Sequence, residues 1–251
     1  MAPTVRVGCS AAEDAAYAVL AELGFPLPLD VGAVREYLGL DLERDGGLPP
    51  AIRGVLDVRA RVIVIQEGLG RAAEEHVVLH EGGHYHLPRH RALLYRCSAF
   101  DLNPSERRRL EAEANTFATV LRFGGVPDGW VDAAPPSIAR VSALADMTGA
   151  SFEAALRWLV QRNRRPVWAL VCDAAGGGGR RARDTVSVRY GYRSTVAPPV
   201  PWPTEVSAQW SGWSTARATT GWPEALAVYQ AVGATGWGAY ATAYWTCVLL
   251  W

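Results

Sequence analysis

All five histidines of the chain lie between positions 76 and 90, and two of them frame the pentapeptide His80-Glu81-Gly82-Gly83-His84. Residues four apart on an α-helix differ by about 40° around its axis, so His80 and His84 can present two imidazoles to one metal ion. Glu81 is offset from His80 by about 100°, which lets its carboxylate reach a water at the metal without binding the metal itself. Two ligands with an adjacent base are typical of zinc peptidases.

The pentapeptide requires a helix, and the flanking sequence predicts one over residues 71–85. Gly68 and Gly70 mark a preceding loop, residues 71–75 favour a helix, and a proline follows at position 88. Gly82 and Gly83 each cost about 1 kcal/mol relative to alanine inside a helix. They indicate either tight packing against a neighbouring element or a helix that is weak at this point.

A catalytic zinc ion usually takes three protein ligands, and a second predicted helix offers the third. Ser105 can cap a helix over residues 106–121, whose apolar residues recur with helical spacing. Glu111 and Asn115 share one face, whereas Glu113 points about 200° away from Glu111, so both glutamates cannot bind one ion. We predict Glu111 as the ligand and Asn115 as a group that orients a histidine or the carboxylate. Taken alone, the two glutamates would be surface charges on an arginine-rich helix.

Together these motifs are similar to those of the ImmA/IrrE family of metallopeptidases. That family pairs a HExxH helix with a later Glu-x-Glu-Ala-Asn-x-Phe-Ala helix, and residues 111–118 of this chain match the second motif. The resemblance covers about residues 10–165 and implies a zincin-like fold with His80, His84 and Glu111 holding Zn²⁺, or Mn²⁺, and Glu81 as the catalytic base. It also implies a protein substrate, a transcriptional repressor of the XRE type, whose cleavage would relieve repression in a stress response or mobile-element switch.

Three departures from the family pattern concern packing rather than the proposed ligands. Gly82 stands where the family usually has a large apolar residue, residues 77–79 replace Thr-x-Ala, and residues 120–123 replace Leu-Leu-Met-Pro. These departures leave room for a second hypothesis. In it the chain is a non-catalytic, metal-stabilised regulatory or antitoxin-like protein that binds a partner without cutting it.

The segments around the two motifs are predicted as short helices, strands and a loop. Helices are expected over 11–23 and 31–38, and strands over 52–58 and 61–66; a strand beside the active-site helix offers an edge to an extended peptide. A loop is expected over 86–104, where we interpret His86 and His90 as polar loop residues rather than ligands. Tyr85 and Tyr95 are alternative candidates for stabilising an oxyanion.

We predict an α+β protein with three parts: a zincin-like metallopeptidase domain (1–130), a helix-turn-helix-like segment (131–165) and a tryptophan-rich, GAF-like α/β module (166–251). The middle part would contain helices over 137–148 and 151–162. Its basic edge permits a third hypothesis, a DNA-binding regulator, but we favour two helices that complete the peptidase core. That edge consists of Arg157, Arg162, Arg164 and Arg165.

The third part is predicted to contain strands over 167–172, 186–190 and 238–250, with a short helix over 223–232. Seven of the ten tryptophans lie from Trp202 onward. They could line a pocket for a small ligand, although core packing is the more common role of tryptophan.

Composition limits the class of protein. The 25 Lys and Arg residues balance the 25 Asp and Glu residues, so no global basic field favours nucleic acid as a partner. The four cysteines are widely spaced, which indicates reduced thiols rather than disulfides or structural zinc. The N-terminus lacks a charged-then-apolar signal segment, and the final aromatic run is too short to span a membrane. We therefore expect a globular cytoplasmic protein without a membrane partner.

Overall fold

The computed structural model describes residues 10–90, 103–173, 185–197, 199, 205–207, 237–241 and 245–250. They belong to two compact units: an N-terminal unit of residues 1–126 and 146–151, and a C-terminal unit of residues 127–145 and 152–251. The mixed α+β class predicted from the sequence is confirmed, while the three-domain division stays a prediction. No helix in the described part is long and apolar enough to cross a membrane.

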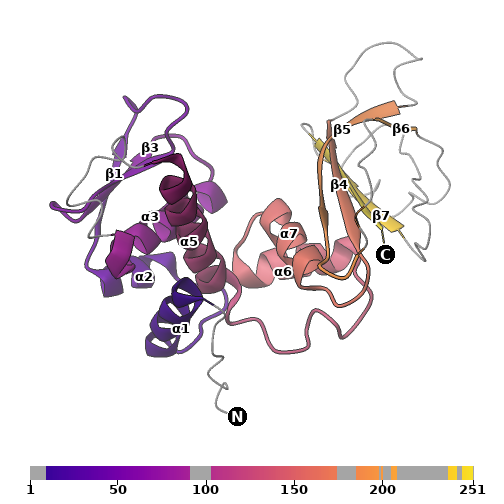
Figure 1. Cartoon of the computed structure of the whole chain (residues 1–251), viewed down its shortest axis with the longest axis horizontal. Helices are drawn as coiled ribbons and strands as arrows, with labels where there is room; N and C mark the ends of the chain where they lie inside the picture. The colour runs from indigo at the N-terminus through magenta and orange to yellow at the C-terminus, as the bar shows by residue number, and fades with distance from the viewer. Residues whose placement is uncertain are drawn as a thin grey trace. The chain divides into compact units, whose positions relative to one another are not determined.

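Two helices with well-defined ends open the N-terminal unit, α1 (Ala11–Leu23) and α2 (Val31–Leu38) (Figure 1). Each starts at a side chain that accepts a hydrogen bond from a backbone N–H of the first turn, and each stops at a glycine in the left-handed conformation, which a side chain would strain. Both helices lie where the sequence predicts them. The capping residues are Ser10 and Asp30, and the glycines are Gly24 and Gly39.

A three-stranded sheet follows, formed by β1 (Asp41–Asp45), β2 (Gly54–Asp57) and β3 (Val62–Gln66). Its order is β1-β3-β2, with β3 parallel to β1 and antiparallel to β2. Ile63 and Ile65 of β3 are fully buried in the core. The two strands predicted from the sequence are β2 and β3. The sequence analysis did not predict β1, because its Asp-Leu-Glu-Arg-Asp sequence is mostly charged and largely exposed.

Two long helices, α3 (Arg71–His86) and α5 (Pro104–Phe123), pack side by side in this unit (Figure 1). The predicted bounds of α3 are correct to one residue. The predicted cap of α5 at Ser105 is wrong: the side chain of Asn103 accepts from the N–H groups of Ser105 and Glu106, at 3.1 and 2.9 Å. Proline at position 104 then starts the helix, because its fixed φ suits the first turn and its missing N–H is not needed there.

The backbones of α3 and α5 come close together at Gly83. A Cβ atom on Gly83 would lie 3.1 Å from Cδ1 of Phe117 and 3.3 Å from the backbone of Ala114. A Cβ on Gly82 would instead meet Cδ1 of Leu38 at 3.0 Å, which is the end of a flexible side chain. Of the two explanations for the glycine pair, tight packing is therefore confirmed for Gly83.

A buried ion pair joins the first turns of α3 to the last turn of α5. Nη1 of Arg122 lies 2.9 Å from Oε2 of Glu75 and donates to the backbone carbonyl of Thr148 at 3.3 Å. Burial lowers the pKa of Arg122 more than the neighbouring Glu75 raises it. Glu75 also accepts a hydrogen bond from Nε of Arg71 at 2.7 Å, and the Arg71 side chain is exposed. The two glutamate oxygens thus pair with one buried and one exposed arginine.

The C-terminal unit contains most of α6 and all of α7, and a sheet of order β6-β5-β4-β8-β7 in which every neighbouring pair is antiparallel. The stretch predicted as one strand over 238–250 forms two paired strands, β7 and β8, so that prediction is wrong. The predicted helix over 223–232 lies outside the described residues. The elements are α6 (Ile138–Thr148), α7 (Phe152–Arg162), β4 (Trp168–Asp173), β5 (Thr185–Arg193), β6 (Glu205–Ser207), β7 (Trp237–Ala241) and β8 (Trp245–Leu250).

Helix α7 packs against β4 and β5. Leu156 and Leu159 on its apolar face are fully buried, and Oε1 of Glu153 accepts hydrogen bonds from the hydroxyls of Tyr190 and Tyr192. The expectation that this helix completes the peptidase core is therefore wrong, because its apolar face covers the C-terminal sheet.

We expect Gly83→Ala to lower the free energy of unfolding by about 1–3 kcal/mol, because the added methyl meets backbone atoms that cannot rotate away. Gly82→Ala is the matched control. Its methyl meets only the end of Leu38, so the variant should be neutral or more stable by up to about 1 kcal/mol. Urea denaturation measures both, and equal losses in the two variants would contradict the close approach at Gly83.

We expect Arg122→Ala to cost about 2–4 kcal/mol of stability, because it leaves Glu75 without its buried partner. Arg71→Ala removes the other arginine from the same carboxylate, but that side chain is exposed, so stability should stay nearly unchanged. Thermal and urea unfolding of the two variants test this difference. Similar stabilities would show that the buried pair contributes no more than the exposed one.

Candidate metal centre

The side chains of His80 and His84 from α3 meet that of Glu111 from α5. The two Nε2 atoms of the histidines lie 3.2 Å apart. The Glu111 carboxylate places Oε2 3.2 Å from Nε2 of His80 and Oε1 3.7 Å from Nε2 of His84. The structure therefore brings together all three ligands predicted from the sequence, with one ligand atom of each within 4.8 Å of the others.

These separations leave room for one metal ion among the three side chains. Two ligand atoms at about 2.0–2.1 Å from a tetrahedral zinc lie about 3.3–3.4 Å apart, and the two Nε2 atoms are 3.2 Å apart. Each histidine faces a different oxygen of Glu111, at 3.2 and 3.7 Å. Two imidazole nitrogens and one carboxylate oxygen are also a donor set used by catalytic zinc sites, which leave the fourth position for water or substrate. The three residues form a possible metal-binding triad.

The charges around the triad suit a cation. The neighbouring imidazoles of His80 and His84 lower the pKa of Glu111 and outweigh the opposing effect of its burial. Burial lowers the pKa of His80, but its hydrogen bond to Glu111 and the charges of Glu81 and Glu111 raise it further, so the net change is upward. The carboxylate thus stays ionised, which is the form that binds a metal.

Glu81, the predicted base, lies beside the triad without being part of it. Burial raises the pKa of Glu81 more than the nearby His80 and His84 lower it, and Glu111 raises it further. Strand β2 runs next to this carboxylate: a Cβ on Gly54 would lie 3.7 Å from Oε1 of Glu81 and only 2.3 Å from a methyl of Val77. Only glycine allows the strand to come so close to the helix.

Asn115 lies near the site, and its side chain binds the backbone of the candidate ligand Glu111. Its Nδ2 donates to the carbonyl oxygen of Glu111 at 2.8 Å. It is also near enough to His80 to contribute to that residue's raised pKa. Within the described part of the chain, however, the buried Nδ1 of His80 has no hydrogen-bond partner of ordinary length and angle. Of the two candidates for stabilising an oxyanion, Tyr85 is buried and Tyr95 lies outside the described residues.

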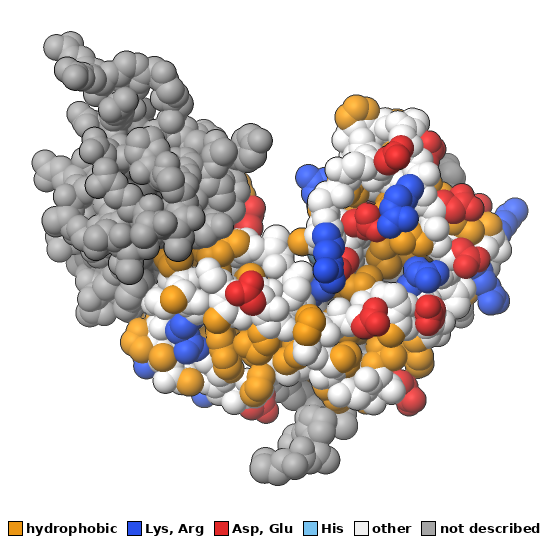
Figure 2. Space-filling view, turned by 180° about the vertical axis from the view of Figure 1, so that it is seen from behind, with side chains coloured by type: hydrophobic (Ala, Val, Ile, Leu, Met, Phe, Trp, Pro, Cys, Tyr) orange, Lys and Arg blue, Asp and Glu red, His pale blue; other side chains and the backbone are white. Residues whose placement is uncertain are grey.

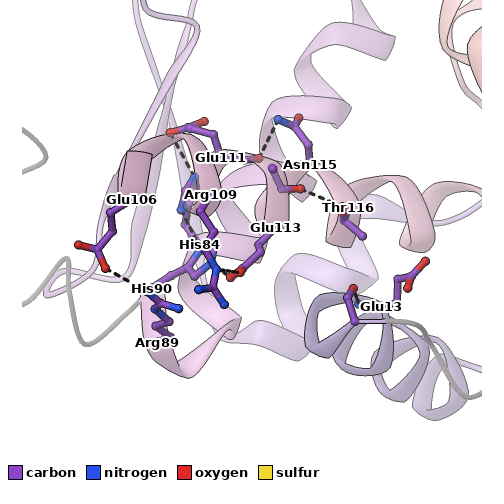
Figure 3. A network of polar contacts seen from close by, with 12 residues as sticks. Glu13, His84, Arg89, His90, Glu106, Arg109, Glu111, Glu113, Asn115 and Thr116 are labelled. Atoms are coloured by element: carbon purple, nitrogen blue, oxygen red, sulfur yellow. Dashed lines mark hydrogen bonds and ion pairs between the residues drawn. The ribbon is translucent and has the colours of Figure 1, made fainter. Parts of the chain in front are cut away.

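Sequence reasoning missed His90 and the role of Glu113. His90 is fully buried and residues 88–90 are helical, so its interpretation as a polar loop residue is wrong. Its Nδ1 lies 3.1 Å from Nδ1 of His84 and its Nε2 lies 2.8 Å from Oε2 of Glu113 (Figure 3). Glu113 points away from the metal ligands, as its helical position predicts, but toward a histidine that contacts one of them. The clustering of all five histidines was the one sequence signal for this arrangement.

His86 has a different environment from the other histidines of α3. Its ring lies 5.5 Å from that of Phe117, measured between centroids, and its side chain is half-buried. It takes no part in the candidate triad. His86 is the last residue of α3, so its interpretation as a loop residue is wrong.

Comparison with known proteins identifies no family for this chain. No protein-family profile matches the chain, and no curated protein matches it. Among solved structures, the chain is similar to a Mycobacterium tuberculosis transcriptional regulator, with a TM-score of 0.46 and 18% sequence identity over 69% of this chain. The match covers 57% of that protein, and a likeness this distant assigns no function.

We expect the purified protein to carry about one zinc ion per chain and His80→Ala to lose it. Glu111→Ala should lower zinc affinity far more than Glu113→Ala, because only Glu111 reaches the ion. His76→Ala is the control, since His76 is exposed and outside the triad. Mass spectrometry of the native proteins measures the metal content, and a wild-type protein that stays empty after zinc is added would refute the site.

Proposed function

We propose that the chain is a metal-dependent endopeptidase whose N-terminal unit has a zincin-like fold. The observation that carries this proposal is the triad of His80, His84 and Glu111, with one ligand atom of each within 4.8 Å of the others, and the Glu81 carboxylate beside it. Zinc is the proposed metal and manganese the alternative. Two imidazoles, one carboxylate and a neighbouring unligated carboxylate are the parts that metal-assisted hydrolysis requires.

The proposed reaction is hydrolysis of a peptide bond. A divalent metal in the triad supplies a Lewis acid that polarises the scissile carbonyl and acidifies water. Glu81 accepts a proton as the water oxygen bonds to the carbonyl carbon, and it returns that proton to the leaving amine when the C–N bond breaks. In the metal-free site burial raises the pKa of Glu81, and a raised pKa makes a carboxylate a better proton acceptor.

The position of β2 supports an extended peptide as the substrate. Within the described residues β2 is the last strand of its sheet, and its Gly54 lies next to Glu81. The polar backbone groups of an edge strand pair readily with an extended segment. Such pairing would place a substrate backbone along the triad. We propose an XRE-type repressor as this substrate, in the cytoplasm, as the resemblance to ImmA/IrrE proteins implies.

For the C-terminal unit we propose a GAF-like sensor module that binds a small ligand. The five-stranded antiparallel sheet with α7 packed against it supports a compact module of its own. Regulation of the peptidase by that ligand would connect the two units functionally.

The surface charge favours the peptidase over a DNA-binding regulator. The arginines of the basic edge are exposed, but Nε of Arg164 lies 3.4 Å from Oδ2 of Asp132. On the face seen in Figure 2, the described acidic and basic side chains are interspersed. Duplex DNA is bound mainly through its phosphates by clustered positive charge, and the acidic neighbours weaken such a field.

We expect Glu81→Gln to keep zinc and to abolish cleavage, because the amide holds its place but cannot accept the proton. Both zinc-loaded proteins would be incubated with a library of natural peptides, and new peptide ends counted by mass spectrometry. Glu74→Gln is the control on the same helix, since Glu74 pairs with Arg44 and lies outside the triad. If Glu81→Gln cuts as fast as the wild type, the mechanism is wrong. If neither protein cuts any peptide or XRE-type repressor, the non-catalytic, partner-binding hypothesis takes its place.

A further inference from the structure

We propose that Glu113, acting through His90, fixes the tautomer and the orientation of the metal ligand His84. This inference rests on the metal centre proposed above. Neither Glu113 nor His90 reaches the metal position itself, so both are positioning residues. Together with Arg109 they form a chain of three polar contacts that ends on the ligand ring (Figure 3).

The contacts determine where the protons lie. Oε2 of Glu113 is an acceptor, so Nε2 of His90, 2.8 Å away, carries the proton of that contact. Nδ1 of a neutral His90 is then an acceptor, and the group that faces it at 3.1 Å is Nδ1 of His84. Nδ1 of His84 must therefore donate, which leaves the lone pair of that ring on Nε2. This is the atom that faces His80 and Glu111, so the tautomer matches what a metal needs.

Arg109 completes the arrangement at the other end. Its Nε donates to Oε1 of Glu113 at 2.7 Å, which leaves the second oxygen of the carboxylate to His90. Arg109 and Glu113 lie one turn apart on α5, so the carboxylate is held by its own helix. The Glu113 carboxylate therefore has a defined position that does not depend on its contact with His90.

The burial of His90 shows how strongly these contacts are required. Its side chain is fully buried, and a buried polar ring is costly unless its nitrogens are hydrogen-bonded. Both nitrogens of His90 have partners in the chain of contacts. The other candidate histidine ligand differs, because its buried Nδ1, on His80, has no such partner among the residues that the structure describes. The two imidazoles thus have different contacts: His84 is bound by His90 through Nδ1, the nitrogen away from the metal position, whereas His80 is bound mainly by Glu111 through Nε2.

The first test is zinc affinity. We expect Glu113→Gln and His90→Phe to weaken zinc binding about 10- to 100-fold, the usual effect of removing a partner that orients a ligand. His90 and Arg109 face different oxygens of Glu113, and in Glu113→Gln one of these oxygens becomes an NH2 group, which donates and cannot accept. The matched control is Glu106→Gln on the same helix, whose partner Arg89 lies 3.0 Å away, outside the triad. Competition with a chromogenic chelator gives the dissociation constants.

The second test reads the tautomers directly in the metal-free wild-type protein. Two-bond ¹H–¹⁵N correlation spectra should show His84 protonated on Nδ1 and His90 on Nε2. In Glu113→Gln the His90 and His84 signals should move toward a mixture of tautomers, while those of His86 stay unchanged. A purely structural role for Glu113 would leave the tautomers as they are. This measurement also stands if His90→Phe fails to fold.

The outcomes separate this inference from the proposed function. If the wild type binds zinc and His80→Ala does not, but Glu113→Gln binds as tightly as the wild type with unchanged tautomers, the positioning role is refuted and the metal centre survives. If the wild type binds no zinc, the metal centre itself is refuted. If zinc affinity and tautomers both change in Glu113→Gln while Glu106→Gln matches the wild type, the positioning role is established.

Discussion

The contact between the backbones of α3 and α5 at Gly83 is the constraint on which the candidate site depends. Gly83 precedes the ligand His84, and Ala114, which it faces, lies one turn beyond the ligand Glu111. A larger residue at either position would separate the helices and with them the imidazole and carboxylate. Gly83 costs α3 about 1 kcal/mol of helix propensity. Because it has no side chain, it allows the two helices to lie this close together.

Different interactions hold this helix pair at its two ends. At one end the buried Arg122 pairs with Glu75 and also binds the carbonyl of Thr148. At the other end the contacts run from Glu113 through His90 to His84. The buried ion pair is sensitive to the loss of either partner, while the histidine contacts also set a protonation pattern. The same packing thus fixes both the spacing of the ligands and the chemical form of one of them.

The sequence predicted the parts of this structure that depend on local signals. The local sequence pattern predicted α1 and α2, and the spacing of two motifs identified His80, His84 and Glu111. Elements that depend on tertiary contacts were not predicted. Strand β1 carries no apolar alternation and forms because β3 pairs with it. The burial of His90 follows from the place where the chain returns after α3, which no local pattern encodes. The helical angle showed that Glu111 and Glu113 cannot bind one ion, but it could not show what Glu113 would face.

The proton arrangement at His84 bears on how a metal would bind. Each of the three contacts along Arg109, Glu113, His90 and His84 pairs one donor with one acceptor when both histidines are neutral, so the fold can set the ring of His84 before any ion arrives. A ligand already held in the binding tautomer loses less conformational freedom when metal binds. His80 is held differently: its Nε2 lies 3.2 Å from Oε2 of Glu111, and among the described residues its Nδ1 has no hydrogen-bond partner. The two candidate ligands are therefore oriented by different contacts, His84 through its own Nδ1 and His80 through the carboxylate that would share the ion.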